Sequence, residues 1–378
     1  MKKYLIIGNG VAGTTAAQEI RKHDTQGQIT MVSQENLPFY SRIKLPDFVA
    51  GLSDTDGLVI RKAQWYKDQQ IDLKTGTEIV EIDHPAKSAR DNNGNLYPYD
   101  SLLIASGSVS FIPPVEGSDK GNVFALRSYE DARQLEGAAT SARNAVVIGG
   151  GLLGLEAAHA LIKKGLQVVV VEFFDRLLPR QMDNNGALLL KKMLEAQGFE
   201  FRLDAKTRQV TGEDRVTGVE LESGEVLPAD LVLFSTGVRS NLALPGKLDL
   251  ETDRGVIVNA RMETGMDGVW AAGDVAQFDG MNFCIWPEAQ EQGRVAGANM
   301  AGAHEEFQAI VPSNRLKVAG IDLGSAGEID PNDELEKDLE QSDTLYRKLV
   351  KKDGRVIGCI MLGDTSGFNE VVKTISGK

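Results

Sequence analysis

One short pattern occurs twice in this chain: a buried strand, a glycine-rich turn and a helix. The first copy is LIIGNGVAGTTAA from Leu5, and the second is VVIGGGLLGLEAA from Val146. In this pattern the glycines permit a tight turn, close approach of a pyrophosphate, and close packing of the helix on the sheet. A chain that carries the pattern twice is constrained towards an α/β fold with two dinucleotide-binding halves.

The first copy contains Gly8, Gly10 and Gly13, and a second strand, QITMVSQE, follows and ends near Glu35. The start of the helix supplies unpaired N–H groups and partial positive charge, which suit a phosphate. A carboxylate at the end of the second strand accepts hydrogen bonds from a ribose. The complete arrangement therefore predicts a bound dinucleotide rather than a plain glycine turn.

The second copy contains Gly149, Gly151 and Gly154, and the following strand, LQVVVVE, ends at Glu172. A carboxylate at this position favours a free 2′-hydroxyl and repels a 2′-phosphate. The residues directly after it, Phe173 and Phe174, add no basic group. We therefore expect NADH rather than NADPH at the second site.

Two dinucleotides in one chain indicate hydride exchange between a nicotinamide and a flavin. Further strands end in small-residue turns at Gly107 (YDSLLIASG), at Gly237 (ADLVLFSTG) and at Asp274 (GVWAAGD). The Asp274 carboxylate can bind a sugar-alcohol hydroxyl. A helix with Pro287 in its first turn is predicted next, and its N-terminus suits negative charge on a reduced ring.

Composition narrows the functional class. The 378 residues predict two or three domains, and the net charge of −13 argues against nucleic acid and anionic membranes as partners. Only two cysteines are present, Cys284 and Cys359, which excludes a disulfide framework and a Cys-x-x-Cys redox pair. No apolar run approaches the roughly 20 residues of a membrane span, and MKKY leads directly into a strand. We expect a cytoplasmic protein without a metal site.

The chain resembles the pyridine nucleotide-disulfide oxidoreductase superfamily in five motifs and in their order: GNGVAG, IASG, VVIGGGLLGLEAA, FSTG and AAGD. The stretches LPFYSRIKLPDFVAG, VEFFDRLLPRQMD and LKVAGIDLGSAGEI are most similar to the NADH:rubredoxin oxidoreductase branch, and next to the flavin module of NADH-dependent nitrite reductases. The resemblance implies two Rossmann-like domains, one inserted in the other, and a small α+β domain at the C-terminal end. It places the FAD domain at 1–108 and 238–305, the NADH domain at 109–237 and the last domain at 306–378.

The resemblance also assigns residues to the FAD site. The expected FAD-binding residues are Gly8, Gly10, Val11, Ala12, Gly13, Glu35, Arg42, Ile79, Ala105, Ser106, Gly107, Gly273 and Asp274. The glycine loop would hold the pyrophosphate, Glu35 the ribose, and Asp274 the ribityl chain. The backbone at Ile79 would meet the adenine, and Arg42 would lie near the flavin.

On the nicotinamide side the resemblance assigns a second set. The expected NADH-binding residues are Gly149, Gly151, Leu152, Leu153, Gly154, Glu156, Glu172 and Gly237. Glu156 falls at the family's glutamate near the nicotinamide and the flavin. No side chain is expected to act as an acid or base, because hydride transfer needs alignment and charge stabilisation.

One departure from the family decides where electrons go. Disulfide reductases need a cysteine pair beside the flavin, and peroxide-handling or oxidase members keep one cysteine in the stretch that reads FYSRIKLPDF here. That stretch has no cysteine, so the flavin is expected to pass electrons directly to an external acceptor. A small acidic electron-transfer protein such as rubredoxin would then need a basic docking patch. The candidate patch comprises Arg347, Lys348, Lys351, Lys352 and Arg355.

Two other interpretations stay open. The chain could be an NADH oxidase or the flavin component of a nitrite-reductase-type complex, which would need a partner subunit. It could instead be an NADH-sensing flavoprotein scaffold that turns over slowly. The acidic stretch 331–343, PNDELEKDLEQSD, is predicted to be an exposed loop or helix without assigned chemistry.

Overall fold

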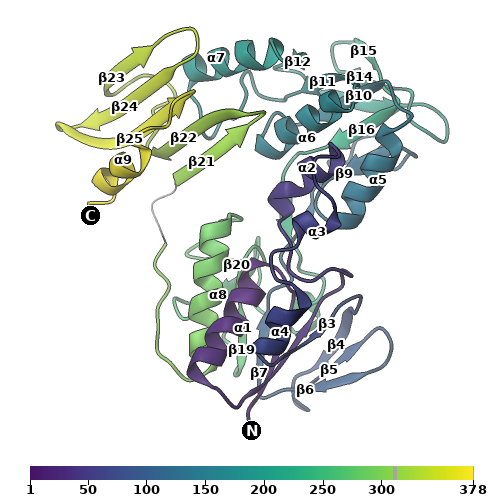
Figure 1. The fold of residues 1–378 in the computed structure, drawn as a ribbon, viewed down its shortest axis with the longest axis vertical. Coiled ribbons are helices and arrows are strands. Elements are labelled where there is room, and N and C mark those ends of the chain that lie inside the picture. The colour runs from purple at the N-terminus through teal and green to yellow at the C-terminus, as the bar shows by residue number, and fades with distance from the viewer. Residues whose placement is uncertain (310–312, 378) are drawn as a thin grey trace. The chain divides into compact units, whose positions relative to one another are not determined.

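The computed structural model describes residues 1–309 and 313–377 (Figure 1). The chain forms two compact units, and each is built from separate stretches of sequence. The first unit contains described residues of 1–43, 54–109 and 238–310, and the second contains those of 44–53, 110–237 and 311–378. Residues 44–53 belong to the second unit, although the sequence ranges expected for the domains place them in the first.

The first unit is organised around a parallel five-stranded sheet with short strands of mostly buried apolar residues. Its order is β19 (Val269–Ala271), β7 (Ser101–Ile104), β1 (Lys3–Ile7), β2 (Gln28–Val32) and β3 (Ile71–Lys74). Parallel strands covered on both faces are apolar throughout, as in LLI of β7 and LII of β1. The sequence-based expectation of a buried strand before the first glycine turn is confirmed.

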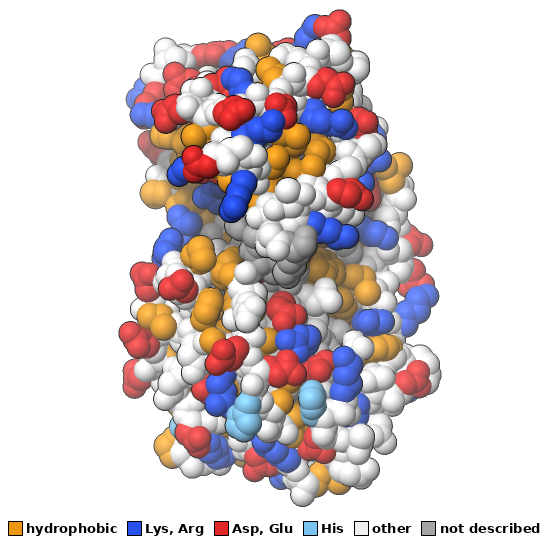
Figure 2. All heavy atoms as spheres, turned by 90° about the vertical axis from the view of Figure 1, so that its left-hand side faces the viewer, with side chains coloured by type: hydrophobic (Ala, Val, Ile, Leu, Met, Phe, Trp, Pro, Cys, Tyr) orange, Lys and Arg blue, Asp and Glu red, His pale blue; other side chains and the backbone are white. Residues whose placement is uncertain are grey.

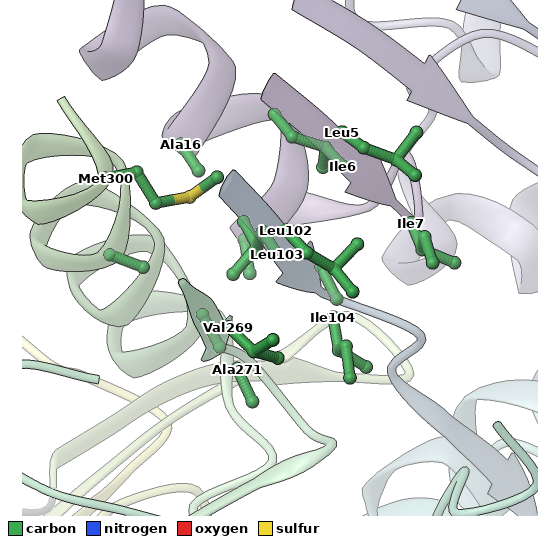
Figure 3. Packing of buried hydrophobic residues seen from close by; sticks show 14 of the residues in the cluster. Leu5, Ile6, Ile7, Ala16, Leu102, Leu103, Ile104, Val269, Ala271 and Met300 are labelled. Atoms are coloured by element: carbon green, nitrogen blue, oxygen red, sulfur yellow. The ribbon is translucent and has the colours of Figure 1, made fainter. Parts of the chain in front are cut away.

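Two helices pack together over this sheet: α1 (Val11–His23) and α8 (Trp286–Met300). They approach closely because α8 presents glycine to α1; a Cβ on Gly293 would overlap the backbone of Ala12. Figure 3 shows side chains of β1, β7 and β19 lying together with Ala16 of α1 and Met300 of α8. The predicted helix with Pro287 in its first turn is confirmed as α8.

Short helices and strands complete the first unit and the segments where the chain passes from one unit to the other. The short helices are η1 (Arg42–Lys44), α3 (Thr55–Leu58), α4 (Ala63–Asp68) and η2 (Pro245–Lys247). The remaining strands are β4 (Ile79–Asp83), β5 (Ser88–Asp91) and β6 (Leu96–Pro98) in one antiparallel sheet, the pair β18 (Val256–Val258) and β20 (Ala276–Phe278), and the pair β8 (Ser108–Ser110) and β17 (Val238–Ser240).

The second unit repeats the parallel sheet. Its order is β12 (Phe199–Arg202), β11 (Gln167–Val171), β10 (Asn144–Ile148), β16 (Leu231–Phe234) and β9 (Val123–Ala125). The helices of this part are α2 (Leu45–Val49), α5 (Tyr129–Ala139), α6 (Leu152–Lys163) and α7 (Asn184–Glu195). An antiparallel sheet of β13 (Thr207–Thr211), β14 (Gly218–Leu221) and β15 (Val226–Pro228) lies beside it.

The C-terminal part of the second unit is an antiparallel sheet with one helix. The order is β21 (Ser313–Val318), β22 (Ile321–Gly327), β25 (Arg355–Leu362), β24 (Tyr346–Lys352) and β23 (Glu336–Gln341). Helix α9 (Phe368–Ile375) covers one face, and its Phe368 ring packs against Gly324, where a Cβ would lie 2.7 Å from the ring. The expected α+β domain is therefore confirmed as a mixed strand and helix structure.

The acidic stretch 331–343 corrects one expectation. The sequence predicts an exposed loop or helix here, but the central residues form β23, paired in antiparallel register with β24. Charged side chains suit this position because β23 is an edge strand, where charges hinder pairing with another chain.

The surface charges and the lengths of the described helices are consistent with a charged sequence that has no long apolar run. Figure 2 shows acidic and basic side chains interspersed on the face that it presents. The longest helix of the described residues, α8, has 15 residues, and none of the helices in this part of the chain combines the length and apolar character required to cross a membrane.

Candidate functional site

The first glycine loop lies at the carboxyl end of β1, and two of its glycines are required by packing. Gly8 has φ +115°, and a Cβ there would overlap the carbonyl oxygen of Ala105. A Cβ on Gly13 would overlap the carbonyl oxygen of Gly8. Gly10 differs, because a Cβ there would meet no atom of the described protein within 4 Å. Protein packing therefore leaves Gly10 unexplained, whereas a ligand lying against the loop explains it.

The second loop reproduces this geometry in the other unit. Gly149 has φ +118°, and a Cβ there would overlap the carbonyl oxygen of Ser235. A Cβ on Gly154 would overlap the carbonyl oxygen of Gly149, while one on Gly151 would meet nothing within 4 Å in the described chain. The same two glycines are held by packing and the same middle glycine is open, so the two loops are built for the same kind of ligand.

Both loops lead into helices that begin without a side-chain cap. Gly10 is the N-cap of α1 and Gly151 is the N-cap of α6, and glycine has no side chain that could accept the N–H groups of the first turn. The first-turn residues are Val11, Ala12 and Gly13 in α1, and Leu152, Leu153 and Gly154 in α6. Their N–H groups lack intrahelical partners and carry the positive end of the helix dipole, so they suit a phosphate.

A buried amide supplies an independent sign of a ligand in the first loop. The side-chain oxygen of Asn9 accepts hydrogen bonds from Tyr66, at 2.9 Å, and from Thr14, at 3.2 Å. Its amide nitrogen, Nδ2, is buried without a partner among the described residues. An orphaned buried donor is destabilising. The residues present therefore fit the pyrophosphate of a dinucleotide such as FAD, which would supply the missing acceptor.

The carboxyl edge of the first sheet also brings together the residues that follow β7 and β19. Ala105 contacts the glycine loop, and Gly107, with φ +68°, accepts the N–H of Asn241 at 2.9 Å. Asp274 follows β19, and its carboxylate accepts the hydroxyl of Ser108 at 2.7 Å. The other predicted residues here are Ser106, which bonds the Asn241 carbonyl, and Gly273, whose N–H donates to Gln292. Ligands of open α/β sheets bind at this edge.

Glu35 and Arg42, predicted for different parts of the dinucleotide, form an ion pair in the structure. The Tyr40 hydroxyl donates to the other Glu35 oxygen at 2.5 Å. Ile79 is buried at the first residue of β4, in the core of the same unit. The structure thus places a carboxylate, a guanidinium and a phenol together beyond the end of β2.

Glu172 directly follows β11 and is 6% exposed. Its Oε2 accepts the N–H of Gly150 at 2.5 Å, and its Oε1 accepts the N–H of Phe174 at 2.9 Å. Both oxygens are therefore fixed by backbone groups, one of them inside the glycine loop. Each carboxylate oxygen can accept a further hydrogen bond, so this geometry is compatible with a ribose ligand.

Glu156 lies on α6, one turn after the open glycine. Its Oε1 accepts the N–H of Ala319, in the turn between β21 and β22, at 3.0 Å. Burial raises the pKa of Glu156, the Ala319 N–H lowers it, and the nearby Asp47 carboxylate raises it. The sequence did not indicate that this turn reaches α6. Gly237, three residues after β16, has φ +99°, and its carbonyl oxygen accepts the Phe111 N–H at 2.9 Å.

The predicted basic patch requires a correction at Lys348. This side chain is 0% exposed, and its Nζ lies 3.0 Å from Asp183 and 2.7 Å from Asp333. It also donates to the backbone oxygen of Asp330 at 2.8 Å. Lys348 cannot dock a partner, because it is a buried link between the C-terminal sheet and Asp183, the N-cap of α7. We name Lys348, Asp183, Asp330 and Asp333 the lysine cluster.

Of the other patch residues, two are already engaged with acidic neighbours. Arg347 lies 3.7 Å from Glu340 and 3.5 Å from Asp364, and Lys351 lies 2.6 Å from Asp338. Lys352 and Arg355 are exposed and face each other across the turn between β24 and β25. The predicted patch is therefore reduced to the end of this hairpin.

Two family descriptions match the chain. Residues 2–293 match the pyridine nucleotide-disulphide oxidoreductase family, and residues 312–378 match the rubredoxin NAD+ reductase C-terminal domain. The first match covers both glycine loops, and the second covers the antiparallel sheet with α9.

Similar proteins include a nitrite reductase [NAD(P)H] from Bacillus subtilis (strain 168), which is 34% identical over 99% of this chain and 47% of its own length. The chain thus spans about half the length of that protein. The NADH-rubredoxin oxidoreductase of Clostridium acetobutylicum is 32% identical over 99% of this chain and 94% of its own. A crystal structure of NADH:rubredoxin oxidoreductase from Clostridium acetobutylicum has a TM-score of 0.84 at 30% identity, covering 100% of this chain and 95% of the other.

Proposed function

Because the chain belongs to the pyridine nucleotide-disulphide oxidoreductase family, we propose that it uses FAD to pass electrons from NADH to a small electron-transfer protein. The observation that carries this proposal is the repeated glycine loop with an open middle glycine, one copy in each unit. Two such loops provide for two dinucleotides in one chain. The fold is the expected α/β class with two Rossmann-like sheets and a C-terminal α+β part.

We place FAD in a domain of residues 1–108 and 238–305, where the Gly10 loop and Asn9 would hold the pyrophosphate. Glu35 would hold the ribose and Asp274 the ribityl chain. When bound, a flavin supplies the chemistry of accepting a hydride and releasing single electrons. Helix α8 begins at Trp286 with Pro287 in its first turn, and the positive end of its dipole would favour negative charge near this start.

We place NADH in a domain of residues 109–237, with the C-terminal domain at 306–378. The Gly151 loop would hold the pyrophosphate and Glu172 the ribose. Glu156 would orient the nicotinamide end, and its bond to Ala319 supports this role because that bond fixes the carboxylate. These residues bind and align the substrate, and none of them is proposed as an acid or base.

Replacing Glu172 by glutamine is expected to reduce the preference for NADH over NADPH by about tenfold. The variant removes a negative charge that repels a 2′-phosphate, and such repulsion at about 4 Å is worth roughly 1–4 kcal/mol near a protein surface. The measurement is the ratio of apparent dissociation constants for NADH and NADPH in anaerobic flavin reduction. Glu200→Gln, on the neighbouring strand β12, is the control. An unchanged ratio in Glu172→Gln would remove Glu172 from the ribose site.

The choice of acceptor is supported by the C-terminal match to rubredoxin NAD+ reductase. It is also supported by the stretch 39–48, which has no cysteine to relay electrons as a thiolate. The similarity to nitrite reductase favours a second candidate, the flavin part of a nitrite-reducing complex. A third possibility, an NADH-sensing scaffold, would bind both dinucleotides but reduce acceptors slowly.

Anaerobic protein reduced with NADH is expected to reduce rubredoxin faster than ferredoxin, oxygen or a siroheme-containing nitrite reductase partner.

We further propose that Lys352 and Arg355 dock the acidic acceptor. The double variant Lys352→Glu/Arg355→Glu is then expected to slow rubredoxin reduction about tenfold at low salt, because opposite charges accelerate protein association. Flavin reduction by NADH is expected to be unchanged.

The matched control is Lys67→Glu, which alters an exposed lysine on α4, far from this hairpin in sequence. Equal rubredoxin rates in the docking variant and the wild type would contradict the docking site alone. Fastest transfer to the nitrite reductase partner would favour the second candidate. Rapid flavin reduction with negligible transfer to every acceptor would favour the scaffold.

A further inference from the structure

Three two-residue turns of the described chain have positive φ at both positions. They are Asp279–Gly280 after β20, Ala319–Gly320 between β21 and β22, and Asp353–Gly354 between β24 and β25. Aspartate followed by glycine is a preferred sequence for such turns, because both residues tolerate this backbone conformation. Ala319 differs from this preference, since it holds φ +49° with a plain methyl side chain. The use of alanine here calls for a specific explanation.

The Ala319 turn is also the buried one of the three. Ala319 is 4% exposed, whereas Asp279 and Asp353 are exposed. Its N–H donates to Oε1 of Glu156 on α6 at 3.0 Å, within the same compact unit. An aspartate at this position would bring a second carboxylate towards Glu156, and glycine would make the turn more flexible. A small residue with a Cβ therefore suits a turn that must hold a carboxylate in place.

Several groups act on the charge of Glu156. Burial and the Asp47 carboxylate of α2 raise the pKa of Glu156, whereas the Ala319 N–H and Lys163 lower it. Further titratable groups on the elements packed here are His159 on α6 and, beside the turn, Lys317 and Asp322. The Ala319 N–H contacts the carboxylate directly, so it stabilises an ionised form that burial and Asp47 disfavour.

We propose that the Ala319–Gly320 turn is a positioning element of the hydride-transfer site. The C-terminal part of the chain then takes part in the reaction of NADH as well as in that of the acceptor. This inference rests on the proposed function, because it takes Glu156 to orient the nicotinamide. The turn holds Oε1, and Oε2 can then accept a hydrogen bond from the nicotinamide carboxamide. Ala319 acts through Glu156 and is a positioning residue.

The test removes this one hydrogen-bond donor. An ester in place of the amide between Val318 and Ala319 removes the N–H and keeps the alanine side chain. The limiting rate of anaerobic flavin reduction by NADH is expected to fall about tenfold, because small misplacements of reacting groups are costly, while the apparent dissociation constant for NADH changes less than about twofold. The pH at which this rate responds to Glu156 is expected to rise, since the lost N–H lowered the pKa of the carboxylate.

A second readout needs no bound flavin and no electron transfer. Carbon-13 NMR follows the titration of the glutamate carboxyl groups, and the resonance that is lost in Glu156→Gln identifies Glu156. In the ester variant the midpoint of this titration is expected at higher pH than in the wild-type protein. A purely structural role for the turn would not produce this shift.

The chain offers a matched control in the same sheet. An ester in place of the amide N–H of Asp353 changes the exposed turn between β24 and β25, and both readouts are expected to be unchanged. Ala319→Gly keeps the N–H and tolerates positive φ, so it is expected to retain the wild-type titration of Glu156.

A genetically encoded pair provides the same comparison. Valine disfavours positive φ, so Ala319→Val is expected to shift the turn and to move both readouts in the direction of the ester variant. Asp353→Val introduces the same backbone conflict in the exposed turn and is expected to leave the titration of Glu156 and the rate of flavin reduction unchanged.

Each outcome decides the inference. An unchanged titration of Glu156 in the ester variant would overturn it, as would a shifted titration with a normal rate of flavin reduction. Equal effects of the Ala319 and Asp353 esters would also overturn it, because a general loosening of the sheet would then be the cause. If the titration shifts but NADH does not reduce the flavin even in the wild-type protein, the proposed function fails while the hold of the turn on Glu156 stands.

Discussion

A Gly151→Val variant is expected to fold, to retain FAD, and to lose about 100-fold or more in affinity for NADH. Gly151 has φ −77° and ψ 175°, which valine adopts without strain, and a Cβ there meets no described atom within 4 Å. The added side chain would instead occupy the space where a pyrophosphate approaches the loop. Loss of two charge-assisted hydrogen bonds, at about 1.5–3 kcal/mol each, corresponds to this change in affinity. The measurement is flavin reduction against NADH concentration.

The equivalent change in the first loop provides the matched control. Gly10→Val is expected to give folded protein with little bound FAD, because Gly10 has φ −88° and the same open surroundings. The flavin content per protein and the far-ultraviolet circular dichroism measure the two properties. Gly154→Val, by contrast, is expected to prevent correct folding, since its side chain would overlap the Gly149 carbonyl. Normal NADH reduction in Gly151→Val would show that no pyrophosphate lies on this loop.

Replacing Lys348 by methionine is expected to lower the free energy of unfolding by about 3–5 kcal/mol. Methionine fills a similar volume but leaves the buried carboxylates of Asp183 and Asp330 without their cation. These carboxylates are 3% and 6% exposed, so water cannot replace the lost partner. Denaturant unfolding followed by circular dichroism measures the change. Lys352→Met, on the exposed end of the same strand, is the control and is expected to change stability by less than about 0.5 kcal/mol.

The loss in Lys348→Met is expected across neutral and mildly alkaline pH. Burial lowers the pKa of Lys348, but hydrogen bonds with Asp333 and Asp183 outweigh burial and the net pKa is raised. Because the pKa of Lys348 is raised in the folded state, its contribution to the free energy of unfolding is complete below its pKa in the unfolded chain, about 10.4. That contribution declines only as the pH rises through the pKa of Lys348 in the folded protein. Equal stability of the Lys348 and Lys352 variants at pH 7 would contradict a structural role for the cluster.

The glycine loops and their parallel strands could be predicted from sequence because their determinants are local. Gly8 and Gly13 are spaced so that each removes a clash with a nearby backbone carbonyl, and the flanking strands are apolar throughout. The same spacing in the second copy gives the same contacts. Sequence also indicated that residues from several strand ends share one site, because parallel strands end at the same edge.

The lysine cluster could not be predicted in the same way. Its partner Asp183 lies 165 residues from Lys348 in sequence, and no local pattern reveals such a pairing. One signal was present: in β24, positions 346, 348 and 350 alternate with the others, and the buried Tyr346 and Val350 mark the face that Lys348 shares. A prediction from charge alone, which ignores this alternation, assigns the buried Lys348 to a docking patch. Strand β23 was missed because pairing with β24, rather than its own composition, makes it a strand.

The order in which the two units can form during synthesis follows from their division of the chain. The first unit's sheet takes an edge strand from β19, and α8 packs on α1, so elements from both ends of this unit are needed. The ribosome will have released all of α6 and the second sheet before α8 emerges. The N-terminal nucleotide-binding unit therefore completes its core only after the inserted sheet has left the ribosome, although its first strand is made at the outset.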